Sequence, residues 1–194
     1  MKYKNMNITI IGISAMAKAV AKIDKTKYET ILIFGDYFEP KAYKGYNTYL
    51  VGRKTLQGHG TGNDLEQGRL AFEESKEEIV NMIHNDYVIV VCGLSRGMSG
   101  GLTTLVKAII DSGKKVFVMV TTPCNFEGPQ AKEKSNLVIN KLKEITDNFC
   151  ISDGQELIYS MSNKISIIEF FKRWDNELYN EIMEFITDYK LIFK

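Results

Sequence analysis

Histidine, cysteine and net charge are all scarce in this chain, and each shortage excludes a class of protein. Only 2 histidines occur among 194 residues, which excludes a histidine-rich metal site. The 3 cysteines, Cys92, Cys124 and Cys150, are far apart and lie in or beside apolar runs, so we expect reduced core thiols in a cytoplasmic protein. A formal net charge of +1 gives no strong attraction to nucleic acid.

Long apolar runs are also missing. None approaches the roughly 20 residues that a membrane-spanning helix needs, and the start, MKYKNMNITII, lacks the apolar core and cleavage site of a signal peptide. With 44% hydrophobic and 25% charged residues, the composition is that of an ordinary globular protein. We therefore expect a single domain over residues 1–194 that binds neither nucleic acid nor membrane.

Apolar segments alternate with helical patterns along the chain. Strands are expected at residues 8–11, 30–34, 49–51, 87–92, 116–120 and 149–151, and helices at 15–23, 65–85, 102–111, 130–145 and 166–188. Asp64 and Ser166 are expected to cap two of these helices. The alternation predicts an α/β fold, a Rossmann-like and mostly parallel sheet with helices on both faces.

Five loops should meet at the carboxyl ends of these strands, where such sheets bind ligands. They cover residues 12–16, 35–40, 52–62, 93–101 and 121–128, and three of them are rich in glycine or small residues. Residues 93–101, GLSRGMSGG, join a strand to a helix, so several backbone N–H groups can gather at the positive end of the helix dipole. This turn therefore suits a phosphate group.

Two common nucleotide motifs are missing. The chain has no GKS or GKT, which argues against a Walker-type phosphate site, and GxGxxG does not follow the first strand, which argues against a nicotinamide enzyme. A nucleotide enzyme of different chemistry on a Rossmann-like sheet remains the weakest of three hypotheses.

Four segments in order resemble the family of FtsZ and tubulin, the filament-forming GTPases, and together they span nearly the whole chain. Residues 58–68, GHGTGNDLEQG, resemble the FtsZ loop GxGAGxxPExG, and RLAFEES continues it. The turn GLSRGMSGG lies where the family has GMGGGTGTG, and residues 120–128, VTTPCNFEG, are similar to VTxPFxFEG. Residues 171–178, FKRWDNEL, lie where the family's central helix contacts guanine.

The resemblance implies binding of GTP or GDP, with Mg²⁺ expected only by analogy. Backbone N–H groups of residues 12–16 and 93–101 would hold the α- and β-phosphates, and residues 58–62 would face the γ-phosphate. Glu127 would accept hydrogen bonds from the ribose, Phe171 would pack on the base, and Asn176 or Asp175 would read guanine. The candidate nucleotide-binding residues are Gly12, Ser14, Ala15, Gly58, Gly60, Thr61, Gly62, Gly93, Ser95, Arg96, Gly97, Met98, Ser99, Gly100, Glu127, Asp153, Phe171 and Asn176. No catalytic residue or metal ligand is assigned.

The chain also departs from the family pattern. Its first loop is one residue shorter than the FtsZ glycine run, and side chains there hinder approach of backbone to phosphate. Lys18 is either a compensating cation or a surface lysine, and Arg96 either donates to a phosphate or blocks the pocket. The sequence stops after the expected central helix, so we expect no second domain, no activating acidic loop, and weak or no hydrolysis by this chain alone.

Two main hypotheses follow. The first is a divergent guanine-nucleotide-binding protein that associates through its nucleotide face with itself or with a full-length family member. The second is a non-enzymatic interaction module that has lost nucleotide, motivated by residues 14–16, Ser95, Arg96 and Met98.

Overall fold

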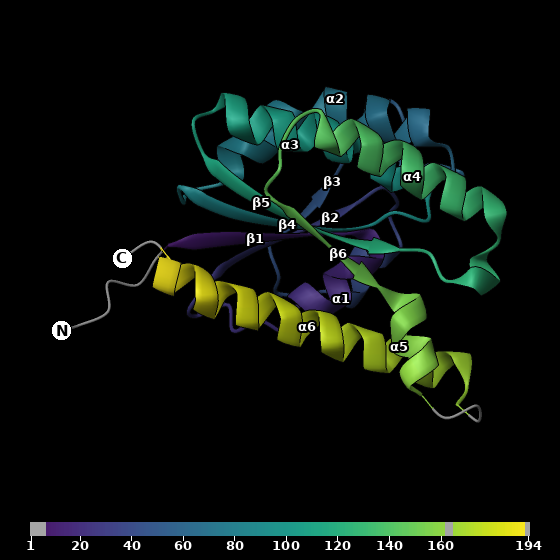
Figure 1. Ribbon diagram of the computed structural model, residues 1–194. Coiled ribbons are helices and arrows are strands. Elements are labelled where there is room, and N and C mark those ends of the chain that lie inside the picture. Colours follow the sequence, from purple (N-terminus) through teal and green to yellow (C-terminus); the bar gives the residue numbers. More distant parts are fainter. Residues whose placement is uncertain (1–6, 162–164, 193–194) are drawn as a thin grey trace.

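The computed structural model describes residues 7–161 and 165–192. Within them, six strands form one parallel sheet in the order β3-β2-β1-β4-β5-β6, which confirms the expected fold class (Figure 1). The strands are β1 (Ile8–Ile13), β2 (Glu29–Phe34), β3 (Thr48–Leu50), β4 (Tyr87–Gly93), β5 (Lys115–Thr122) and β6 (Phe149–Asp153).

Helices cover both faces of the sheet. They are α1 (Ala17–Val20), α2 (Leu65–Met82), α3 (Leu102–Asp111), α4 (Pro129–Lys143), α5 (Gly154–Ser160) and α6 (Ile167–Ile192). Helices α2, α3 and α4 lie on one face, whereas α1 and the long α6 lie on the other (Figure 1). Short 3-10 turns occupy Ser14–Met16, Glu39–Ala42, Gly97–Gly101 and Asn125–Glu127.

The central strands are apolar throughout because both of their faces are covered. All six residues of β1 are buried, and alternate side chains enter two separate cores. Ile11 packs in the core under α2 and α3, whereas Ile10 packs in the core against α1 and α6. No helix among the described residues is long and apolar enough to span a membrane.

Both expected helix caps are confirmed. The Asp64 carboxylate accepts a hydrogen bond from the Glu66 N–H at 2.7 Å, and the Ser166 hydroxyl accepts one from the Glu169 N–H at 3.2 Å. The helix expected at residues 15–23 is shorter, because a 3-10 turn precedes the four-residue α1. Helix α2 ends at Met82, where Ile83 becomes extended with φ −87° and ψ 108°.

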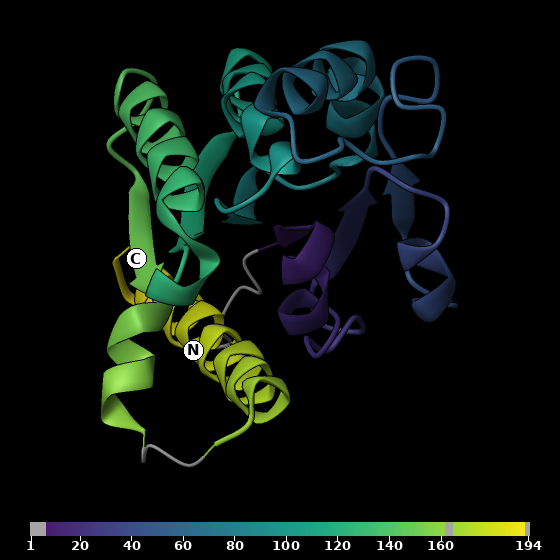
Figure 2. The ribbon, with the colours of Figure 1, turned by 90° about the vertical axis from the view of Figure 1, so that its right-hand side faces the viewer.

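The chain order reverses between β1 and β4, which are neighbours in the sheet. Connections that follow these two strands leave in opposite directions, and this opens a crevice at their carboxyl ends. Figure 2 faces this edge, where the turn after β1, the loops that follow β2 and β4, and the start of α6 surround one region. The expected ligand loops therefore do meet.

Candidate functional site

A cavity of about 480 Å³ lies at this edge, a volume typical of small-molecule sites. Its walls are formed by α6 and by the five loops that follow β1, β2, β3, β4 and β5. Ten candidate residues line it: Ser14, Ala15, Gly60, Thr61, Gly93, Ser95, Arg96, Met98, Glu127 and Phe171. Eight others do not: Gly12, Gly58, Gly62, Gly97, Ser99, Gly100, Asp153 and Asn176.

The turn after β1 brings backbone into the cavity. Ser14 has φ 49°, in the left-handed region that a residue with a Cβ seldom adopts. Such local strain is often stored at functional sites. Gly12, two residues earlier, is buried within β1, and a Cβ there would lie 2.9 Å from a Val20 methyl group. Gly12 is therefore required for packing β1 on α1.

Glycines in the turn of Gly97–Gly101 allow contact with α2. A Cβ on Gly100 would lie 1.9 Å from the Leu65 carbonyl oxygen, and one on Gly101 would lie 2.0 Å from the Phe72 ring. Gly68 of α2 lies equally close to this turn, since a Cβ added to it would lie 2.0 Å from the Gly97 carbonyl oxygen. The turn that leads into α3 is thus fixed on the backbone of α2, which holds its N–H groups in place.

Met98 lines the cavity and Ser99 does not, but both side chains pack against neighbouring parts of the fold. Met98 is buried, and its sulfur fills the gap between Gly35 and Leu56. The Ser99 hydroxyl donates to the Arg96 carbonyl at 2.7 Å. Arg96 itself is exposed on the cavity wall, where its guanidinium can meet an anion.

The loop of residues 58–63 is built on left-handed backbone. Gly58, Gly60 and Gly62 have φ of 76°, 76° and 56°, and Asn63 has φ 65°. The Gly60 N–H donates to the Gly35 carbonyl at 3.1 Å, and Lys134 of α4 donates to the Asn63 carbonyl at 2.6 Å. The loop is therefore tied to the end of β2 on one side and to α4 on the other.

Two carboxylates that the candidate list omitted line the same cavity. Asp36 Oδ1 accepts hydrogen bonds from the Phe38 and Glu39 N–H groups at 2.7 and 2.9 Å, which orients it. Burial raises the pKa of Glu39, the Asp36 charge adds to this, and Ser14, Lys18 and Arg96 oppose it. The loop of residues 35–40 had been expected at this edge, but nothing local in the sequence indicated that these carboxylates face the phosphate loops.

These two side chains offer oxygen ligands of the kind that Mg²⁺ prefers. Among the described residues no group of three or more metal-ligating side chains exists. Magnesium usually binds through one or two carboxylates together with phosphate oxygens and water. Asp36 and Glu39 therefore fit the ion only as part of a nucleotide complex.

Aromatic residues from α6 form the far wall. The rings of Phe171 and Trp174 lie 6.2 Å apart and only 13° from parallel, and Phe126 meets the Phe171 ring edge-on at 6.1 Å. Gly154 makes room for this wall, since a Cβ there would lie 2.3 Å from the Trp174 ring. The half-exposed face of Phe171 is open to the cavity.

The two acceptors expected to read a base occupy different places. Asp175 lines the cavity, and burial raises its pKa while Lys18 and Lys22 oppose the increase. Asn176 lies outside, where its side-chain oxygen accepts a hydrogen bond from Lys22 at 2.6 Å. Asp153 also lies outside and caps α5 by accepting from the Gln155 N–H at 2.9 Å.

Glu127 is held by the turn in which it lies. Its Oε1 accepts a hydrogen bond from the Cys124 N–H at 3.0 Å, and Gly128 follows with φ 89°. The carboxylate thus has a fixed orientation at the cavity edge, with its second oxygen available. Thr121 and Thr122 at the end of β5 also line the cavity, although the sequence pattern did not select them.

Comparison with known proteins gives sequence matches over most of the chain. Residues 15–162 match the sequence model described as "Tubulin/FtsZ family, GTPase domain". The mitochondrial division protein fszB of Dictyostelium discoideum is 28% identical over 140 residues, which are 70% of this chain and 38% of that protein. The cell division protein FtsZ of Helicobacter pylori is 29% identical over 131 residues, 66% of this chain and 34% of that protein. The matched region thus spans little more than a third of these relatives.

Solved structures share the fold. The empty FtsZ dimer of M. jannaschii gives a TM-score of 0.86 at 24% identity, over 93% of this chain and 54% of that one. The GTPγS-bound protofilament of CetZ2 from Haloferax volcanii gives 0.83 at 20% identity, over 95% of this chain and 59% of that one. The shared fold therefore covers more than nine-tenths of this chain.

Proposed function

Since the chain belongs to the tubulin/FtsZ family, we propose that it binds GTP or GDP in the cavity at the carboxyl ends of β1 and β4. The observation that carries the proposal is the meeting of five separate loops at one crevice, with α3 beginning just behind it. Backbone N–H groups of residues 14–16 and of Ser95, Arg96 and Met98, near that helix N-terminus, would hold the phosphates. The Arg96 guanidinium would add a charge-assisted contact.

The same geometry would also provide binding sites for a divalent cation, the ribose and the base. Asp36 and Glu39 would hold Mg²⁺ against the phosphate oxygens, and the bound ion would neutralise phosphate charge. The free oxygen of Glu127 would accept hydrogen bonds from the ribose hydroxyls. Phe171 would stack on the base, and Asp175, which lines the cavity, would accept from guanine in preference to Asn176.

We further propose that the protein associates through the rim of this cavity with itself or with a longer family member. Exposed apolar side chains lie beside the cavity: Phe126 is 51% exposed and meets the Phe171 ring edge-on, and Ile168, 67% exposed, lies about one helical turn before Phe171 on α6. Exposed apolar patches of this kind commonly mark protein interfaces. Relatives of similar fold are described as a dimer and as a protofilament. Hydrolysis by the chain alone is expected to be weak or absent.

A cytoplasmic setting suits the cysteines. All three are free, and Cys92 and Cys124 are buried as expected, whereas Cys150 is half-buried. Burial raises the pKa of the Cys92 and Cys124 thiols to about 12 and that of Cys150 to about 11. All three are therefore protonated and unreactive at neutral pH, as suits a reducing compartment.

The alternative is an interaction module that has lost nucleotide. The observation in its favour is the first turn, where Ser14, Ala15 and Met16 all present side chains at the cavity. Side chains in place of glycine reduce the room for phosphate against backbone.

Isothermal titration calorimetry with GTP and GDP, in the presence of Mg²⁺, separates the two functions. Nucleotide binding predicts a measurable heat that fits a dissociation constant in the micromolar range or below. The absence of heat at millimolar nucleotide would favour the interaction module. Replacing Arg96 by Gln should weaken binding about tenfold if its guanidinium meets phosphate, and strengthen binding if the side chain obstructs the cavity. Arg53→Gln is the matched control, since Arg53 lies outside the cavity over the Tyr49 ring.

A further inference from the structure

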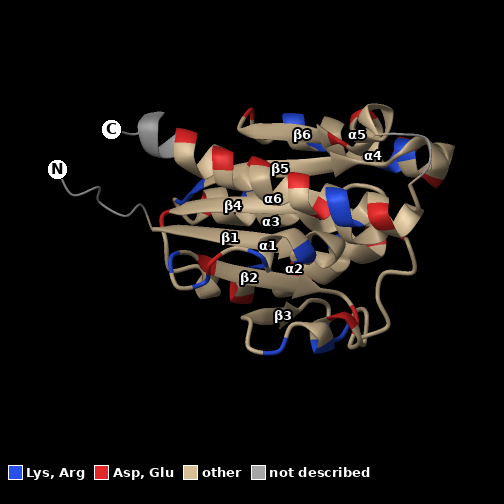
Figure 3. Ribbon diagram, turned by 90° about the horizontal axis from the view of Figure 1, so that it is seen from below, with Lys and Arg blue, Asp and Glu red and all other residues tan. Residues whose placement is uncertain are grey.

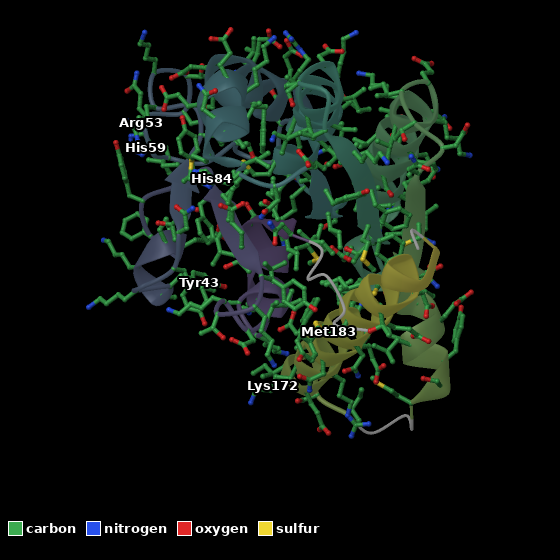
Figure 4. The ribbon with its side chains drawn as sticks, turned by 90° about the vertical axis from the view of Figure 1, so that its left-hand side faces the viewer. Tyr43, Arg53, His59, His84, Lys172 and Met183 are labelled. Carbon is green, nitrogen blue, oxygen red and sulfur yellow. The ribbon has the colours of Figure 1, made fainter. Side chains whose placement is uncertain are left out.

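Lys18 of α1 and Lys22, which follows that helix, lie near the first half of α6 on the lower side of the molecule. Figure 3 shows both acidic and basic residues near the start of α6, whereas acidic residues predominate along the rest of it. Lys18 and Asp175 line the nucleotide cavity, and both also line an adjoining groove with Lys22, Tyr43, Lys172 and Asn176. Figure 4 shows Tyr43 and Lys172 on this lower side, well away from Arg53 and His59. The cavity and the groove therefore meet at the Lys18–Asp175 pair.

Lys18 and Lys22 are engaged differently. Lys22 donates to the Asn176 side-chain oxygen at 2.6 Å, so its ammonium is engaged outside the cavity. Lys18 precedes it by four residues, about one helical turn, and lies on the same side but nearer the ligand space. Within the described residues, Lys18 makes no hydrogen bond or ion pair of its own. Its ammonium lies at the cavity, where its positive charge acts on the carboxylates of both Glu39 and Asp175.

Asp175 faces Lys18 from α6, beside the aromatic wall. Its carboxylate lies next in sequence to Trp174 and one turn along from Phe171, the ring proposed to stack on the base. Although burial raises the Asp175 pKa, the positive charges of Lys18 and Lys22 oppose the increase. The edge of a base stacked on Phe171 would therefore meet an acceptor and a cationic donor together.

The Lys18 ammonium and the Asp175 carboxylate can distinguish purines by the edge that each base presents. Guanine presents an oxygen acceptor at C6 beside two donors, N1–H and the 2-amino group, whereas a 6-amino purine presents a donor at C6 and an unprotonated N1. An ammonium and a carboxylate match the first pattern at every position and oppose the second. Polar groups left without partners in a binding site cost much affinity, so a matched set gives strong discrimination.

On the premise that the proposed nucleotide binding is correct, we infer that Lys18 is a base-specificity residue that donates to the 6-oxo group while Asp175 accepts from N1–H and the 2-amino group. Lys18 then excludes adenine and other 6-amino purines. This role differs from a general phosphate contact, which would act equally on every nucleotide whatever its base.

The test compares three diphosphates by calorimetry: GDP, inosine diphosphate, which lacks the 2-amino group, and 2,6-diaminopurine riboside diphosphate, which has an amine at C6. In Lys18→Met, GDP affinity should fall about tenfold or more, as for a lost hydrogen bond to a charged group, while affinity for the diaminopurine nucleotide should not fall. The preference for GDP over inosine diphosphate should stay unchanged, because Asp175 sets it. Lys22→Met is the matched control and should keep all three ratios.

Equal losses for GDP and the diaminopurine nucleotide in Lys18→Met would overturn the inference, since Lys18 would then be a phosphate contact. Unchanged GDP affinity in Lys18→Met would overturn it too. Neither result would touch the proposed function, because the wild type would still bind GDP. If the wild-type protein binds none of the three nucleotides, the proposed function fails and the inference falls with it.

Discussion

Single glycines decide how closely the turn of Gly97–Gly101 can approach α2. A Cβ on Gly100 would lie 1.9 Å from a backbone oxygen, and backbone cannot move aside as a flexible side chain can. The sequence-level interpretation of this glycine was a phosphate contact. The structure gives it a packing role, and the two roles are connected, since a loosened turn would also misplace the N–H groups.

Gly100→Ala should therefore destabilise the fold strongly. We expect the free energy of unfolding to fall by about 3 kcal/mol, at the upper end for overpacking, as measured by urea denaturation. Gly113→Ala is the control, because no atom lies within 4 Å of its Cβ position and only the φ of 83° opposes the side chain. That variant should lose about 1–2 kcal/mol. Equal losses would show that Gly100 is not sterically constrained.

Glu29 forms a polar cluster at the amino ends of the strands, where His84 is labelled in Figure 4. Burial alone would raise the pKa of Glu29, but hydrogen bonds from the Thr9 hydroxyl and from His84 lower it overall. A carboxylate whose pKa is lowered by folding stabilises the protein above its unfolded pKa of about 4.3, and this stability is lost as the pH falls through the folded value.

Glu29→Gln should consequently cost stability at about pH 7, and the difference from wild type should shrink toward zero by about pH 3. Urea denaturation at several pH values measures it. The exposed Glu133→Gln provides the comparison and should show little change at any pH. A Glu29→Gln deficit that does not depend on pH would mean that shape, and not charge, matters at this position.

At the scale of elements, α2 supports the loops around the cavity from outside. Glu74 accepts hydrogen bonds from the Lys54 N–H at 2.9 Å, the Thr55 N–H at 3.0 Å and the Thr55 hydroxyl at 2.8 Å. The neighbouring Glu73 pairs with Lys76 on the same helix. A helix whose charge pattern indicates a solvated face thus also holds a loop.

Glu74→Ala should loosen residues 52–62 without unfolding the protein. We expect about 1–2 kcal/mol less stability, since three hydrogen bonds to an exposed charge are lost, and faster amide hydrogen exchange confined to this loop. Glu73→Ala removes a charge from the same turn and should leave exchange in the loop unchanged. Uniform acceleration across the whole chain would instead indicate global destabilisation.

The elements that sequence patterns predicted well are those whose signals are local. Strands β1, β4 and β5 are long apolar runs, and the expected bounds of α3 match the observed Leu102–Asp111. Helix α5 was missed because it has seven residues and depends on Gly154 meeting Trp174, twenty positions away in the sequence. The inward direction of Asp36 and Glu39, and the outward direction of Asn176, likewise depend on contacts between distant segments.

At the scale of the whole molecule, the proposed ligand site and the proposed association surface share the cavity rim. Phe171 lines the cavity and also contacts Phe126 on the exposed rim, so a base stacked on Phe171 would lie against residues that a partner covers. Association should therefore proceed through one end of the molecule, along the direction of the strands.

Ile168→Ser should weaken association while leaving nucleotide affinity unchanged, because Ile168 is 67% exposed and does not line the cavity. Sedimentation velocity with and without GTP would measure the shift toward monomer, which we expect to be about tenfold in the dissociation constant. Ile110→Ser, on α3 and away from the rim, controls for surface polarity. If both variants behave alike, the rim is not the interface.

Trp174 gives this molecule an intrinsic optical reporter. It is the single tryptophan in the chain, it is 8% exposed, and it lies in the cavity wall nearly parallel to Phe171. Its emission therefore comes from one defined place, and a base stacked on Phe171 would quench or shift that emission. The chain can thus signal the arrival and departure of its ligand by its own fluorescence, without any attached dye.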